Sequence, residues 1–137
     1  MALSLIRYLD ATLDKSKIKS QDVRSVVSAV ARNPSGSQVA WRHFQMHWDE
    51  LLDRFGIGSF TIGAIIEATT AHFSTAFDYA QVKTFFNKAR RKRVGSGRRA
   101  LDQSMEQILI NTQWRETHEA DIRAWIQSKV GNSFDDR

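Results

Sequence analysis

The sequence predicts an all-α protein, built from about seven helices stacked as antiparallel hairpins in a solenoid-like array. Three observations carry this prediction. Apolar residues recur at steps of three and four along nearly every segment, no segment alternates as a half-buried strand does, and Pro34 is the only proline. The 137 residues are 42% hydrophobic and 26% charged, which is typical of one globular domain with a real core.

Two amphipathic helices are predicted before the first turn. The first is marked by leucines four residues apart, namely Leu5, Leu9 and Leu13. The second begins at Ser20, whose hydroxyl can cap a helix, and it carries a face of valines, namely Val23, Val26, Val27 and Val30. The NPSG sequence at 33–36 ends this helix, because Pro34 disfavours a helical conformation in the residue before it.

Five further helices are predicted after that turn. A long third helix carries the stripe Trp41, Phe44, Trp48, Leu51, Leu52 and Phe55, and Gly56 suits the left-handed position that closes it. Apolar sets mark the fourth (Ile62, Ile65, Ile66, Thr69, Phe73) and the fifth (Val82, Phe85, Phe86). The sixth carries Leu101, Met105, Ile108 and Leu109, and the seventh Ile122, Trp125 and Ile126. Short connections of about three to eight residues make successive helices antiparallel.

The most charged stretch is RRKRVGSGRRAL at 90–101. Six of its twelve residues are Lys or Arg, while the whole chain has a net charge of +5, so the basicity is local. Three interpretations fit: a nucleic-acid patch, a dibasic processing site, or a connection between helices. Interleaved aromatic residues and a recognition helix are missing. We therefore predict an exposed basic interhelical loop at 89–97 and no nucleic-acid partner.

The sequence HFQMH places two histidines on one helical face. The spacing of His43 and His47 is the one that a zinc site on a helix requires. A zinc peptidase helix also needs a glutamate directly after the first histidine, and Phe44 occupies that position. Glu67 is a tempting third ligand further along the chain. We interpret both histidines as surface or boundary residues and predict no metal or cofactor in this chain.

No residue is predicted to be catalytic, cofactor-binding or metal-binding. The four tryptophans suit either a core or a stacking platform, and Trp41, Trp48 and Trp125 lie in register with aliphatic residues, which favours the core. Phosphate-binding loops and nucleophile motifs do not occur. The N-terminal segment is amphipathic rather than signal-like, and no apolar run approaches the ~18 residues of a membrane span. We expect no direct membrane contact, and the residues alone give no localisation.

Several motifs follow one another in order along nearly the whole chain. They are IKSQDVRSVVSAVARNPSGSQVAWRHFQMHW, GSFTIGAIIEATTAHFST, VKTFF, GSGRRALDQSMEQILINTQW and IRAWI. Together they resemble the C-terminal helical domain of the gluzincin zinc aminopeptidases, which include the membrane alanyl (N-type), thyroliberin-degrading and endoplasmic-reticulum enzymes. The resemblance implies a single C-terminal domain over 1–137 with a HEAT-like α-solenoid fold.

The same resemblance implies a function for a larger enzyme. Such an enzyme removes N-terminal residues from peptides, using a zinc-activated water. This domain would cover the thermolysin-like catalytic domain, line the cavity that holds the peptide substrate and, in some members, form a homodimer contact. The family's His-Glu-x-x-His and exopeptidase motifs are absent here, so the zinc would belong to the catalytic domain and the chain alone would be inactive. The implied location is the extracellular face of the plasma membrane or the secretory lumen. The alternative is a stand-alone helical-repeat interaction module without enzymatic activity.

Overall fold

The computed structural model describes residues 1–57 and 59–134, and within these residues it contains helices and turns but no strand. In order, the helices are α1 (Ala2–Ala11), α2 (Ser20–Arg32), α3 (Ser37–Met46), α4 (Trp48–Phe55), α5 (Phe60–Thr70), α6 (Ala76–Phe85), α7 (Lys88–Arg93), the 3-10 helix η1 (Gly95–Gly97) and α8 (Arg98–Phe134). The all-α prediction is confirmed.

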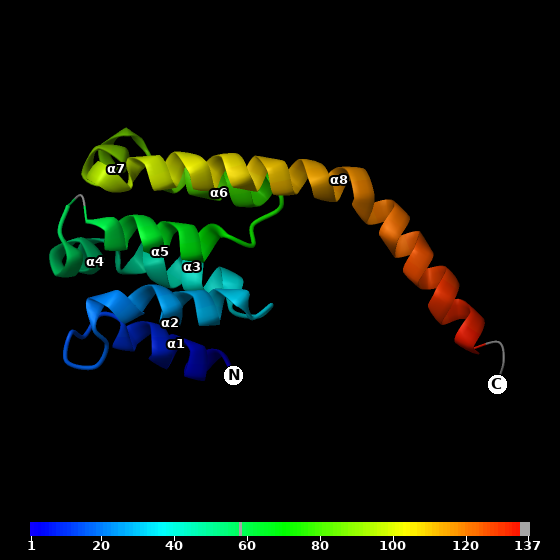
Figure 1. Ribbon diagram of the computed structural model, residues 1–137, viewed down its shortest axis with the longest axis horizontal. Coiled ribbons are helices and arrows are strands. Elements are labelled where there is room, and N and C mark those ends of the chain that lie inside the picture. Colours follow the sequence, from blue (N-terminus) through cyan, green and yellow to red (C-terminus); the bar gives the residue numbers. More distant parts are fainter. Residues whose placement is uncertain (58, 135–137) are drawn as a thin grey trace.

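The helices stack in successive layers, and α8 extends beyond the stack (Figure 1). Helix α2 packs against α1, α3 and α5, and α5 in turn packs against α8. Helices α6 and α8 lie side by side in the last layer (Figure 1). This stacking of short, connected helices is what the hairpin pattern predicts, whereas the HEAT-like solenoid arrangement stays a prediction.

The core is centred on a cluster of aromatic rings from α3, α4 and the end of α6. Trp41 is only 1% exposed, and its ring centroid lies 5.5 Å from that of Phe85 in an edge-to-face arrangement. The Phe85 and Phe86 rings meet edge to face at 5.0 Å, and Trp48 packs across both of them. Edge-to-face aromatic pairs stabilise a fold by more than the burial of their apolar area alone. The predicted core positions of Trp41 and Trp48 are confirmed.

Two local predictions about the first helices are wrong. Ser20 is the first residue of α2 rather than its cap: Lys19 holds the cap position, and no side chain there accepts a hydrogen bond. The predicted long third helix is two helices, because the backbone of His47 leaves the helical region at φ −107° and ψ 22°. Its N–H still bonds the carbonyl of His43, so the chain turns at His47 without losing that bond. Gly56 ends α4 at a positive φ of 82°, as predicted for a glycine.

The predicted basic loop at 89–97 is instead helical. Asn87 caps α7 by accepting a hydrogen bond from the backbone N–H of Arg90, and η1 follows directly. The side chain of Arg90 donates to the carbonyl of Phe85, and Arg93 pairs with Asp49 at 2.8 Å. Val94, in the middle of the segment, is fully buried. The segment is therefore a helical connection between α6 and α8 in which Arg90 and Arg93 have partners outside it, while Lys92 and Arg93 remain exposed as predicted.

The predicted sixth and seventh helices are one helix of 37 residues, α8. No glycine or proline lies between Arg98 and Gly131 to break it, and residues of high helix propensity fill the interval. Its first half packs on the body through buried residues such as Leu101 and Ile108. Its second half projects past the last layer (Figure 1). Trp125 is consequently 63% exposed, so its predicted core position is wrong.

Candidate functional site

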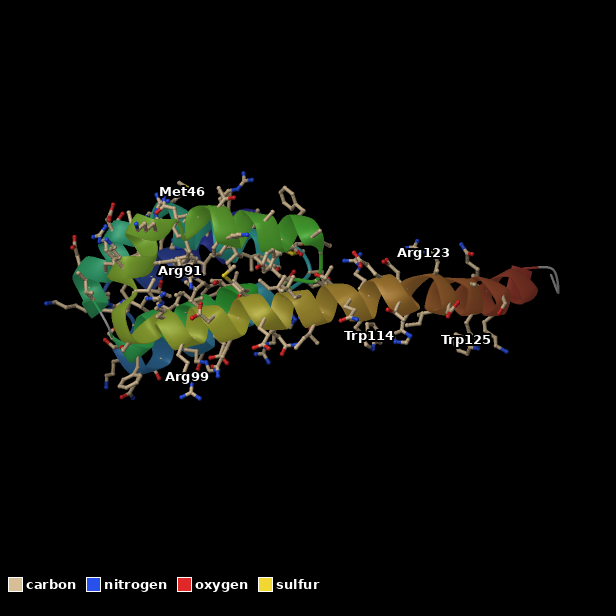
Figure 2. The ribbon with its side chains drawn as sticks, turned by 90° about the horizontal axis from the view of Figure 1, so that it is seen from above. Met46, Arg91, Arg99, Trp114, Arg123 and Trp125 are labelled. Atoms are coloured by element: carbon tan, nitrogen blue, oxygen red, sulfur yellow. The ribbon has the colours of Figure 1, made fainter. Side chains whose placement is uncertain are left out.

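The projecting part of α8 carries an apolar face that no described residue covers. We call residues 113–131 the distal α8, and every side chain in it is at least partly exposed. Its large apolar side chains are Trp114, Ile122, Trp125, Ile126 and Val130. Figure 2 shows Trp114 and Trp125 pointing to one side of the helix and Arg123 to the other. Residues spaced by three, four or eight share one helical face, so this face is continuous.

A groove of about 730 Å³ runs along this face where α8 leaves the body. It is lined by apolar residues including Trp114, Ile122 and Ile126, and by Ser74 from the segment before α6. At its inner end, Asn111 donates a hydrogen bond of 3.0 Å to the carbonyl of Phe73. This groove is suited to apolar contact with another protein surface rather than to chemistry.

The charged side chains along the groove are ion-paired with one another. Arg115 pairs with Glu119 at 3.0 Å, and Arg123 pairs with the same carboxylate at 3.1 Å. The hydrogen bonds from Arg115 and Arg123 hold the pKa of Glu119 below its usual value. Arg115 also donates to the Ser74 hydroxyl at 3.1 Å, which ties the start of the distal α8 to the body. These charges form a rim beside the apolar face and contain no unpaired nucleophile or base.

A second cluster lies where α1 meets the turn between α3 and α4. Within the described part of the chain, Asp10, His43 and His47 form the one group of three or more potential metal ligands, with ligand atoms all within 4.8 Å of one another. The Nε2 of His43 lies 2.9 Å from a carboxylate oxygen of Asp10. The centroids of the two imidazole rings are 4.3 Å apart.

The environments of the two histidines differ. His43 is buried, so the prediction of a surface or boundary position is wrong for this residue. Burial lowers the pKa of His43, while its hydrogen bond with Asp10 opposes that shift. His47 is partly exposed, as predicted, and its Nδ1 lies 2.8 Å from a carboxylate oxygen of Glu50. Glu67 is remote from the cluster and pairs with Arg24 at 3.4 Å.

Sequence spacing did not reveal Asp10. It precedes His43 by 33 residues and reaches it only because α1 packs against α3. In the sequence, Asp10 is one of the charged residues that interrupt an amphipathic segment, and nothing in its spacing connects it to the histidines. Asp10 therefore joins the two histidines of the HFQMH motif through a tertiary contact between α1 and α3.

A family model describes most of this chain. The model for the ERAP1-like C-terminal domain matches residues 3–110, which is well over half of the sequence. This chain belongs to the ERAP1-like C-terminal domain family. The match includes α1 to α7 and the first part of α8, and it ends before Trp114. The resemblance found in the motifs is thereby confirmed.

Curated relatives of this ERAP1-like domain are aminopeptidases. The chain is 33% identical over 129 residues to aminopeptidase Ey of Gallus gallus, a match that covers 94% of the chain and 13% of the relative. It is 36% identical over 123 residues to aminopeptidase N of Canis lupus familiaris, covering 90% and 13%. It is 34% identical over 121 residues to endoplasmic reticulum aminopeptidase 1 of Homo sapiens, covering 88% and 13%. The chain thus spans about an eighth of the length of these relatives.

The domain's own helices are not membrane spans. Across the described residues, none combines the length and the apolar character needed to cross a bilayer, and the long α8 is rich in charge.

Proposed function

We propose that this chain serves as the non-catalytic C-terminal domain of a zinc metalloaminopeptidase that removes N-terminal residues from peptides. The observation that carries the proposal is the family match over residues 3–110, together with relatives that are named as aminopeptidases. In this role the domain covers the catalytic domain, lines part of the cavity that holds the peptide, and takes part in a homodimer contact.

The distal α8 supports this role, because its apolar face is one that a neighbouring domain would cover. Trp114, Ile122 and Ile126 lie on one side of a helix that stands clear of the body, and together they line an open groove. Exposed apolar surfaces with a charged rim are typical of protein contacts, and tryptophan is enriched at their centres. The ion pairs of Glu119 with Arg115 and Arg123 would form that rim.

The chemistry of hydrolysis is assigned to another part of the enzyme. The sequence has neither the His-Glu-x-x-His helix, which would supply two zinc ligands and a general base, nor the exopeptidase motif. The zinc that activates the attacking water would be held by the catalytic domain. This chain would enclose the peptide and hold it in position. Both effects raise the rate of hydrolysis, because bulk water is excluded and the substrate is held in place.

A complementation experiment tests the proposal. Aminopeptidase N of Canis lupus familiaris is prepared without the stretch that matches this chain, and the isolated chain is then added. We expect the chain to bind the truncated enzyme and to raise its release of an N-terminal amino acid from a fluorogenic substrate, with a chelator abolishing the activity. The chain alone should release none.

Two variants locate the contact. Trp114→Ser with Trp125→Ser should weaken binding to the truncated enzyme by at least about tenfold, since large aromatic contacts at an interface centre contribute about 2 kcal/mol or more. Met46→Ser is the control, because Met46 is also a largely exposed apolar residue but lies on the body, away from the distal α8 (Figure 2). A chain that neither binds nor restores activity, yet is stable and monodisperse alone, would favour the stand-alone interaction module instead.

A further inference from the structure

We propose that Asp10, His43 and His47 form a binding site for a divalent transition-metal ion, with Zn²⁺ as the expected occupant. This site is separate from the catalytic zinc of the family and does not depend on the proposed function. Its effect would be to fasten α1 to the turn between α3 and α4.

The donor set is one that Zn²⁺ accepts. Two imidazoles and one carboxylate are a common set of three protein ligands, with a fourth position left for water. Bond lengths of about 2.0–2.2 Å put the ligand atoms of a tetrahedral site about 3.4 Å apart. Here the closest pair is 2.9 Å apart, between His43 and Asp10, and all the ligand atoms lie within 4.8 Å of one another. Ångström-scale side-chain movements would therefore form the site.

The cluster has the mobility and the access that binding requires. His43 is held by its burial in the core, and it would be the fixed ligand. The side chain of Asp10 is 55% exposed and that of His47 is 24% exposed, so both can adjust and an ion can enter from solvent. The fourth coordination position would face the same solvent.

Glu50 supplies the supporting contact that metal-bound histidines usually have. Its carboxylate lies 2.8 Å from the Nδ1 of His47. A carboxylate that accepts a hydrogen bond from one ring nitrogen orients the imidazole and makes the other nitrogen a better ligand. Because Nδ1 of His47 is engaged with Glu50, we assign Nε2 as the nitrogen that would bind the ion. The carboxylates of Asp10 and Glu50 together would balance the charge of a divalent cation.

A bound ion would link α1 to the end of α3, two helices that otherwise contact each other through packing. Asp10 belongs to the last turn of α1, whereas His43 and His47 belong to the end of α3 and its cap. An ion bound by the folded chain and not by the unfolded chain stabilises the fold in proportion to the logarithm of its concentration over Kd. Zinc should therefore raise the unfolding temperature.

The test is titration of the tag-free chain with ZnCl₂ by calorimetry at about pH 7.5, where unperturbed histidines are neutral. Titration with Co²⁺ is followed in parallel by its visible absorption. We expect one ion per chain, a higher unfolding temperature with zinc, and a Co²⁺ spectrum of a low-coordinate site. Absence of binding, or binding without thermal stabilisation, would overturn the proposal.

Variants decide which residues hold the ion. Asp10→Asn and His47→Gln are near-isosteric changes outside the buried core that keep a polar group beside His43, and circular dichroism and the unfolding temperature without metal check that the fold is retained. Each should weaken zinc binding at least about tenfold, and Glu50→Gln should weaken it by about 10–100-fold. The matched controls are His72→Gln and His118→Gln, which replace exposed histidines elsewhere and should leave the affinity unchanged. Equal affinity in Asp10→Asn, His47→Gln and the unmodified chain would show that the cluster is only a hydrogen-bonded contact.

Discussion

Trp41 and Trp125 lie in two regions of this molecule that share the same apolar periodicity, yet one tryptophan is buried and the other is exposed. Both tryptophans lie in register with aliphatic neighbours on a helix. Trp41 lies in the body and is 1% exposed among other aromatic rings, whereas Trp125 lies in the distal α8 and is 63% exposed. Periodicity thus identifies the apolar face of a helix, but the surface that covers this face is a property of the tertiary structure. The distal α8 has an apolar face and nothing in the described chain to cover it.

Replacing these two tryptophans should give the largest contrast. Trp41→Ala removes a buried ring and leaves a cavity, so we expect a loss of about 3–5 kcal/mol in the free energy of unfolding. Trp125→Ala removes an exposed ring and should change the isolated chain by less than about 0.5 kcal/mol. Urea denaturation of both variants measures the difference. Equal losses would mean that the distal α8 is packed in solution.

Two glycines give a smaller contrast of opposite sign. A Cβ at Gly36 would lie 2.0 Å from the carbonyl oxygen of Val30, a backbone atom that cannot move away cheaply. Gly36→Ala should therefore cost about 1–3 kcal/mol of stability. A Cβ at Gly131 meets nothing within 4 Å, so Gly131→Ala should strengthen the helix by about 0.5–1 kcal/mol. Helical circular dichroism and chemical denaturation measure the two effects, and a destabilising Gly131→Ala would contradict the exposed position of the distal α8.

Acid should affect the distal α8 through Glu119. Hydrogen bonds from Arg115 and Arg123 lower the pKa of this carboxyl in the folded helix, while an unperturbed glutamate titrates at about 4.3. Its stabilising effect is therefore fully present above that value and is lost as pH falls through the lower folded pKa. We expect the protection of amides around Glu119, measured against the intrinsic exchange rate at each pH, to fall in that pH range, but no such change in Glu119→Gln. Glu116→Gln is the control on the same helix and should behave like the unmodified chain.

The sequence was sufficient for the all-α class, for the aromatic core around Trp41 and for the family resemblance, because these depend on local periodicity and ordered motifs. The sequence was insufficient where tertiary contacts determine a helix boundary or bring distant residues together. The break at His47 lies inside an uninterrupted apolar stripe, and Asp10 joins the histidines only through the packing of α1 on α3. The basic segment formed a helix because Asn87 caps it and Val94 is buried, neither of which its charge pattern indicates.

The continuity of α8 could have been predicted. No glycine or proline separates Leu101 from Val130, and the two apolar sets in this interval are joined by residues that favour helices. The expectation of antiparallel hairpins suggested a turn there without any residue that would make one. Burial of Trp125 was predicted from its register with aliphatic neighbours, and in the described residues no helix packs over that face.

The most direct test of the central claim is the size and activity of the native protein. It is isolated from cells that express it with an antibody raised against this chain, and it is assayed for aminopeptidase activity with and without a chelator. We expect a polypeptide several times larger than the 15.7 kDa of this chain, carrying chelator-sensitive activity. A single species of 15.7 kDa without aminopeptidase activity would contradict it and would identify an independent helical module.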